Sequence, residues 1–143
     1  MKRLLCAVTA LSMALCLCAC ARTPEQRALS MLESEFGLDL GGGKYTVREL
    51  YYTYDDGNIF GEGQAEYKIS FKSDASALFS RLDTLPDING NDALRLAREI
   101  DPELPEPEDG AHFAYKSENN GLNWVLLLYY SSENAAYLII SDS

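Results

Sequence analysis

The segment from residue 55 to residue 63 carries the densest set of side chains that could do chemistry in this sequence. Asp55, Asp56, Asn58 and Glu62 offer oxygen atoms on a turn that also contains three glycines. Oxygen ligands suit a hard cation such as Ca²⁺, although this spacing matches no calcium-loop consensus. Asp-Gly with further glycines is also what a β-hairpin loop requires. We therefore predict a hairpin loop here, with a calcium site as the alternative.

A second group of candidates is aromatic and flanks this segment. It consists of Tyr51, Tyr52, Tyr54 and Phe60. Neighbouring residues of a strand point to opposite faces, so Tyr51 and Tyr52 cannot both face a core. Exposed tyrosines are effective interface residues, because each offers a large contact area and a hydroxyl at small entropic cost. These four residues form the predicted interaction site; the alternative is that they fill the sheet with their hydroxyls at its rim.

Residue types that serve nucleophilic or metal catalysis are scarce. His112 is the only histidine, and the acidic residues gather in residues 101–109 and at Glu33 and Glu35. A glycosidase needs a partly buried acid facing a second one across a cleft, whereas these acids lie on a proline-rich loop and a solvated helix face. All four cysteines lie in the first twenty residues, namely Cys6, Cys16, Cys18 and Cys20. We predict no catalytic site and no cofactor.

The first twenty residues have the pattern of an export signal. Lys2 and Arg3 are followed by an apolar stretch, residues 4–17, that is too short to span a bilayer. Leu17-Cys18-Ala19-Cys20 resembles the lipobox of bacterial lipoproteins. The resemblance implies cleavage before Cys20 and a diacylglycerol on its thiol, which places the protein outside the cytoplasm on a membrane of the bacterial cell envelope. The alternative is an ordinary secretory signal that is cut after Ala21.

Length and net charge describe the chain that follows the predicted signal. Residues 1–19 are the predicted signal peptide, residues 20–22 the lipidated cysteine with a very short tether, and residues 23–143 a single domain. The chain has a net charge of −10, and loss of Lys2 and Arg3 with the signal would leave −12. This balance excludes nucleic acid as the expected partner and permits a cationic one. Apart from the lipid bilayer, the expected partner is a protein of the envelope.

The pattern of apolar residues predicts an α+β domain. One strand, at about 122–131, is apolar on both faces, so it is central and covered on both sides or keeps one face for a partner. In the strand at about 64–72, Ala65 and Tyr67 share the apolar face, and Glu66 and Lys68 share the polar face. About five antiparallel strands and about three helices are expected, in the order α-β-β-α-α-β-β-β. Predicted helices begin at Thr23, Asp74 and about Asn91, and predicted strands span about 44–54, 64–72, 111–117, 122–131 and 136–142.

One stretch carries a further resemblance. Gly57-Asn58-Ile59-Phe60-Gly61-Glu62-Gly63, the strand that ends in Ser70-Phe71, and the late Tyr-Tyr hairpin are similar to a group of small exported proteins of Gram-positive bacteria. That group has a Gly-x-x-Phe-x-Gly-Asp-Gly-like segment, and Glu62 stands where Asp is usual. The resemblance covers about half of the domain. It implies a shared fold and location, and no mechanism, because the group has no assigned activity.

Position along the chain gives the functional expectation. The first predicted helix starts three residues after Cys20, so the domain is held close to the membrane. We expect a non-catalytic binding or protein-interaction module near the membrane surface. The alternative is a receptor for a small molecule or cation that uses the 55–63 loop.

Overall fold

The computed structural model describes residues 23–54, 62–84, 88–107, 111–118 and 122–143, with only the backbone described at 83, 84 and 88–90. Cys20, Phe60 and three of the four predicted calcium ligands, Asp55, Asp56 and Asn58, lie outside these ranges. The described elements are α2 (Pro24–Phe36), β1 (Tyr45–Tyr52), β2 (Gly63–Phe71), α3 (Ser76–Phe79), β3 (Asp83–Thr84), α4 (Ile88–Ile100), β4 (His112–Glu118), β5 (Asn123–Tyr130) and β6 (Ala135–Asp142).

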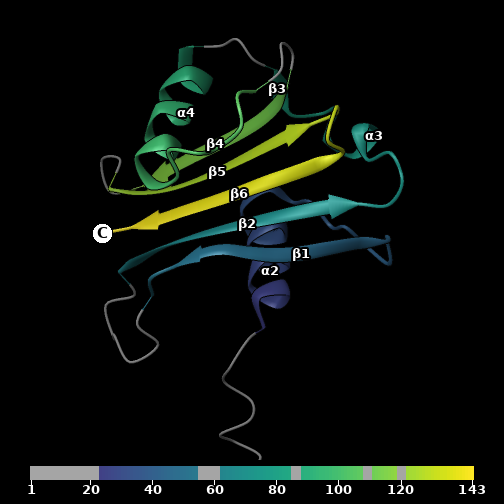
Figure 1. The fold of residues 1–143 in the computed structure, drawn as a ribbon, viewed down its shortest axis with the longest axis horizontal. Helices are drawn as coiled ribbons and strands as arrows, with labels where there is room; N and C mark the ends of the chain where they lie inside the picture. Colours follow the sequence, from purple (N-terminus) through teal and green to yellow (C-terminus); the bar gives the residue numbers. More distant parts are fainter. Residues whose placement is uncertain (1–22, 55–61, 85–87, 108–110, 119–121) are drawn as a thin grey trace, which may run out of the picture.

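The strands form one antiparallel sheet in the order β1-β2-β6-β5-β4-β3 (Figure 1). Five strands have seven to nine residues, and β3 has two. The predicted α+β class, with about five strands and about three helices, is confirmed. β6 lies between β2 and β5, so the last strand of the chain joins the first hairpin to the later strands.

The first helix begins after Thr23, as predicted, and is capped at both ends. The Thr23 hydroxyl accepts a hydrogen bond from the Gln26 N–H, and the Gln26 side chain accepts one from the Thr23 N–H. This capping box satisfies two N–H groups that have no partner inside the helix. Gly37 ends α2 with φ 61°, a left-handed conformation that glycine adopts without strain.

The second helix, predicted to begin at Asp74, is short. α3 is a single turn of four residues, and the chain enters β3 before Pro86. Asp74 does accept a hydrogen bond from the Ser76 N–H at 2.9 Å, as a capping residue would, but Ala75 occupies the N-cap position. Pairing of β3 with β4 replaces the expected helical turns. α4 begins at Ile88, before the predicted start at about Asn91.

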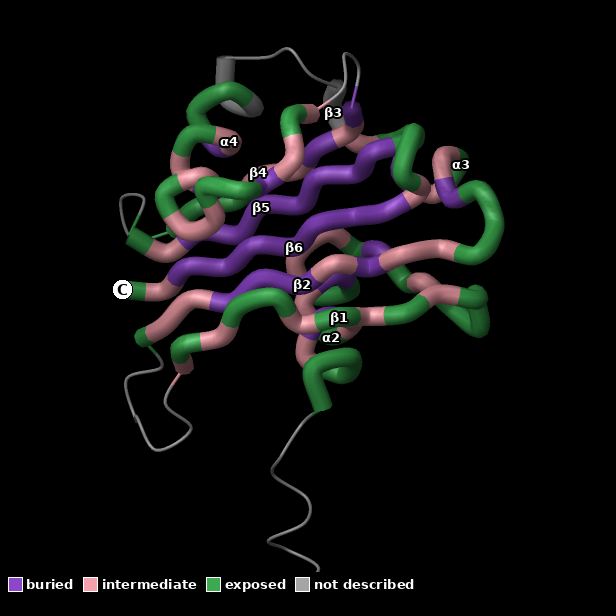
Figure 2. Tube along the Cα trace, in the orientation of Figure 1, coloured by how far each residue is buried: buried purple, intermediate pink, exposed green. Residues whose placement is uncertain are grey.

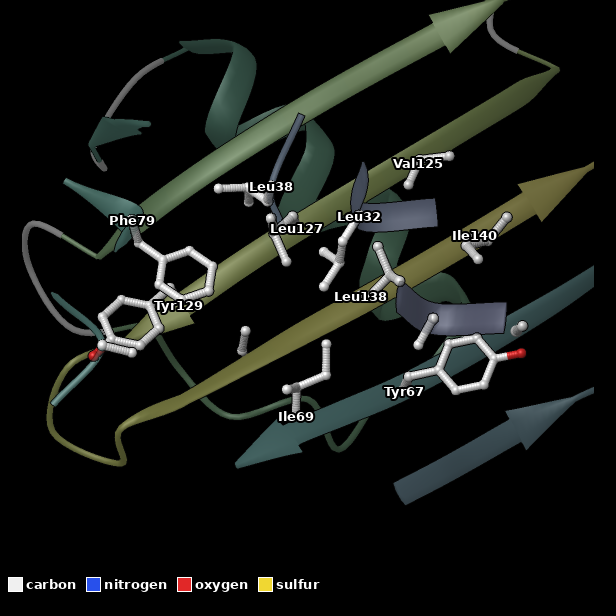
Figure 3. Packing of buried hydrophobic residues seen from close by; sticks show 14 residues of the cluster. Leu32, Leu38, Tyr67, Ile69, Phe79, Val125, Leu127, Tyr129, Leu138 and Ile140 are labelled. Carbon is white, nitrogen blue, oxygen red and sulfur yellow. The ribbon is translucent and has the colours of Figure 1, made fainter. Parts of the chain in front are cut away.

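Both faces of the central strands are buried. Side chains of β5 alternate between two clusters, with Leu127 and Tyr129 on the α2 side and Leu126 and Leu128 on the α4 side. Figure 2 shows the buried trace concentrated in β5, β6 and part of β2. On the α2 side Tyr67 lies at one end of the cluster, and Phe79 stacks on Tyr129 at the other, with ring centroids 4.3 Å apart (Figure 3). β5 is thus a central strand covered on both sides.

One residue of β2 contradicts its predicted environment. Ala65, Tyr67 and Ile69 face the α2 cluster as expected, but Glu66, predicted on the wet face, is only 1% exposed. The segment that follows α4 contributes Leu104 to the cluster on that side and places the side chain of Asp101 within hydrogen-bonding contact of Glu66. Alternation along one strand carries no information about a segment that is 35 residues away in sequence.

The surroundings of the Glu66 carboxyl favour its protonated form. Burial, then the charge of Asp101 and the hydrogen bond with it, raises the pKa of Glu66 from 4.5 to about 7. Its Oε1 has no hydrogen-bond partner among the described residues. A proton on Glu66 therefore stabilises the folded state, and ionisation leaves a buried charge beside a second carboxylate.

The stability of the protein should therefore decrease as pH rises. The unfolded chain loses the Glu66 proton near pH 4.5 and the folded chain near pH 7, so the contribution present below about pH 4.5 is lost by about pH 8. The free energy of unfolding of the wild type, measured against that of Glu66→Gln, should fall by up to about 3 kcal/mol over this range. Urea denaturation at a series of pH values measures this difference.

Glu118→Gln is the matched control, because Glu118 is exposed on β4. The difference between wild type and this variant should not change with pH. A Glu66→Gln variant that keeps the pH profile of the wild type would contradict the assignment.

Candidate binding cleft

A cleft of about 400 Å³ lies between α2 and the strand ends at β1, β2 and β6. Three tyrosines, three small or apolar residues, two serines and three charged residues line it: Tyr52, Tyr54, Tyr67, Met31, Ala65, Ile140, Ser30, Ser34, Arg27, Glu35 and Asp142. The volume is within the range of small-molecule sites, as is the combination of apolar walls with a few polar groups.

Arg27 connects α2 to the floor of this cleft. Its Nη2 lies 2.7 Å from Glu49 Oε2, and its Nε donates to the Tyr67 hydroxyl at 3.2 Å. The guanidinium also lies over the Tyr52 ring, with Cζ 4.3 Å from the ring centroid. Burial alone would lower the pKa of Arg27, but the hydrogen bonds to Glu49 and Tyr67 outweigh it and raise the pKa. The cation is therefore held by three groups of the sheet.

Tyr54 lies next to Tyr52 in the wall of the cleft. Its hydroxyl donates to Asp142 Oδ2 at 2.6 Å, and its ring centroid is 5.4 Å from that of Tyr52. Burial and the Asp142 carboxylate raise the pKa of Tyr54, so the hydroxyl stays protonated and remains a donor. A Cβ at Gly63 would lie 2.7 Å from the Tyr54 ring, so only glycine lets the ring lie this close to the start of β2.

A smaller cleft of about 130 Å³ adjoins the first one. The two share Met31, Glu35 and Asp142, and the smaller one extends toward Lys116 and Trp124. Lys116 Nζ lies 3.8 Å from Glu35 Oε2. The two clefts therefore adjoin along one side of α2.

The predicted aromatic site is divided between two faces. Tyr52 and Tyr54 line the cleft, whereas Tyr51 pairs with Glu66 in register and is 41% exposed. The register of β1 against β2 shifts between Glu49 and Tyr51, which leaves Leu50 as an extra residue of a bulge. The expectation that Tyr51 and Tyr52 cannot both face the core is confirmed.

The predicted calcium site stays a prediction. Glu62 is exposed, and it is the one proposed ligand that falls in the described ranges. Among the described residues, no group of three or more histidine or acidic side chains could hold a metal ion.

Sequence reasoning missed three of the residues that shape the cleft, Arg27, Tyr67 and Asp142. Arg27 and Tyr67 are 40 residues apart, and Asp142 is 88 residues from Tyr54. Tyr67 was predicted as a core residue, and nothing in the local pattern separates Arg27 from other solvated helix positions. These contacts depend on which strands are neighbours, which periodicity does not report.

Comparisons with protein families, with characterised proteins and with solved structures find no match to this chain. Within the described ranges, no helix has the length and apolar character needed to cross a membrane.

Replacing Arg27 should destabilise the protein well beyond the loss of a surface ion pair. Arg27→Ala leaves the buried Tyr67 hydroxyl and the Glu49 carboxylate without this donor, and we expect a loss of about 1–3 kcal/mol in the free energy of unfolding. Urea denaturation measures this loss.

Arg95→Ala is the matched control, since it removes an arginine from an ion pair on a helix surface. The side chains of Arg95 and Glu99 are 64% and 62% exposed, against 26% and 28% for Arg27 and Glu49. The control should lose no more than about 0.5 kcal/mol. Equal losses in both variants would contradict the role given to Arg27.

Proposed function

We propose that this protein is a lipid-anchored, extracytoplasmic binding protein that acts without catalysis and holds its ligand in the cleft beside α2. The cleft itself carries this proposal: about 400 Å³ with tyrosine and aliphatic walls, bordered by hydrogen-bonded polar groups. Such a site suits a small molecule more than a protein loop. The proposal therefore favours the alternative of a receptor for a small molecule. Tyr52 and Tyr54, which line the cleft, come directly before the 55–63 segment in the sequence.

The proposed anchor would place the cleft near the membrane. Ala21 and Arg22 are the only residues between Cys20 and the N-cap Thr23, a distance of roughly 10 Å for an extended chain. Arg27, Met31 and Glu35 of the same helix line the cleft.

A second candidate function is supported by the edge of the sheet. In the described part of the chain, β1 pairs with β2 alone, so its outer edge has no neighbouring strand. Leu50 and Tyr51 are 38% and 41% exposed on this strand. A protein partner that adds a strand to β1 would cover both side chains, which is the interaction-module interpretation.

Filling the cleft tests the proposed function. Full-length protein, extracted in mild detergent and incubated with the small-molecule fraction of a bacterial envelope extract, should show a small-molecule adduct in native mass spectrometry. Ser34→Trp places a large ring in the cleft from the exposed side of α2 and should reduce the adduct at least about tenfold, because the ligand loses its volume.

Ser73→Trp is the control for this experiment. Ser73 is also exposed, but it follows the end of β2 that is remote from Ala65 and the cleft. The control should keep the adduct. Loss of the adduct in both variants, or in neither, would contradict binding in the cleft.

The same preparation tests the anchor. Mass spectrometry of the mature N-terminal peptide should find a chain that begins at Cys20 and carries a diacylglycerol on its sulfur. A peptide that begins at Arg22 would instead show the ordinary secretory signal.

A further inference from the structure

The charge of the cleft is set by carboxylates. Arg27 is the only cation among the described residues that line it, and its charge is neutralised by Glu49 at 2.7 Å. Glu35 and Asp142 line the same cleft. Lys116 approaches Glu35 only at 3.8 Å and is half exposed, so solvent screens that pair. An anionic ligand would therefore find no uncompensated positive charge among the described residues of the cleft. A cationic ligand would find the carboxylates of Glu35 and Asp142.

The aromatic walls add a second preference for a cation. Tyrosine rings attract a cation over their faces, and Tyr52 already holds the Arg27 guanidinium in this way at 4.3 Å. Tyr54 lies next to Tyr52, and its hydroxyl is fixed on Asp142. A positive group bound at this wall would meet a π system and a carboxylate together.

The rest of the lining is suited to an uncharged body. Met31, Ala65 and Ile140 supply aliphatic surface, and Ala65 and Ile140 belong to the buried cluster on the α2 side of the sheet. A volume of about 400 Å³ accommodates a compact molecule with a ring or a short chain.

We infer that the cleft selects a small organic cation, an amine or guanidine attached to an aromatic or aliphatic body, with its positive group against the Tyr54 ring and beside the Asp142 carboxylate. This inference rests on the proposed function, because it names the class of ligand for the same site.

Three probes that share one ring separate charge from shape: 2-phenylethylammonium, the neutral 2-phenylethanol and the anionic 3-phenylpropionate. The readout is the NMR chemical shift of the methyl groups of Met31 and Ile140 in the full-length protein, held in micelles of a nonionic detergent. The ammonium probe should shift these methyl signals and bind at least about tenfold more tightly than the alcohol. The carboxylate probe should bind most weakly.

Two conservative variants test where the charge acts. Asp142→Asn keeps an acceptor for the Tyr54 hydroxyl and should weaken binding of the ammonium about tenfold, without changing binding of the alcohol. Glu35→Gln, on the outer side of the cleft, should weaken it in the same direction and does not touch the Tyr54 contact. Glu103→Gln makes the same change of charge at an exposed position outside the cleft and should have no effect.

The outcomes separate this inference from the proposed function. If the alcohol or the carboxylate shifts the same methyl groups as strongly as the ammonium does, the cleft binds ligands but the inference of a cation is wrong. If none of the three probes moves Met31 or Ile140, the inference of a cation fails, and the adduct experiment with Ser34→Trp decides separately whether the proposed function fails as well. An affinity for the ammonium that is unchanged in both cleft variants would also overturn the inference.

Discussion

Burial of both faces of β5 and β6 is the constraint on which the structure depends. Apolar side chains alternate to both sides along these two strands, and an antiparallel pair of this kind is stable only when each side is covered. The chain supplies the two covers from separate parts of its sequence, α2 on one side and α4 with its following segment on the other (Figure 1). The three-layer arrangement follows from this requirement.

The sheet surface beside α2 differs from the surface beside the segment that follows α4. The cleft lies beside α2, and there the Arg27 side chain extends from the helix to Tyr67 and Glu49. On the α4 side the segment around Leu104 closes over Glu66, and Asp101 meets its carboxyl. The α2 side keeps an open cleft, whereas the α4 side is closed and buries the Glu66 carboxyl. The open cleft and the buried Glu66 both depend on which part of the sheet α2 and the segment after α4 contact.

Local signals in the sequence predict the fold well. Thr23, Pro24 and Gln26 mark the start of α2, Gly37 marks its end, and the two apolar faces of β5 mark the centre of the sheet. Each of these signals reflects contacts within a few residues or the total burial of a strand.

Long-range contacts account for what the sequence did not reveal. Glu66 lies on a face that alternation assigns to solvent, and only the distant Asp101 segment buries it. The cleft joins Arg27 of α2 to Tyr54, which follows β1, and to Asp142 at the end of β6. Tyr52 and Tyr54 of the predicted aromatic site line this cleft, but their role as an interaction site stays a prediction, and their partners depend on strand order.

Photo-crosslinking in living cells tests the central claim most directly, namely that this protein holds a small ligand in the cleft beside α2. A photoreactive amino acid would replace Ser34 in the cleft, or Leu50 on the exposed edge of β1, in the full-length protein. The proposed function predicts that the position-34 peptide gains the mass of a small molecule and that position 50 forms no conjugate. A conjugate of protein size at position 50, with no addition at position 34, would contradict the cleft as the binding site and favour a partner on the edge of the sheet.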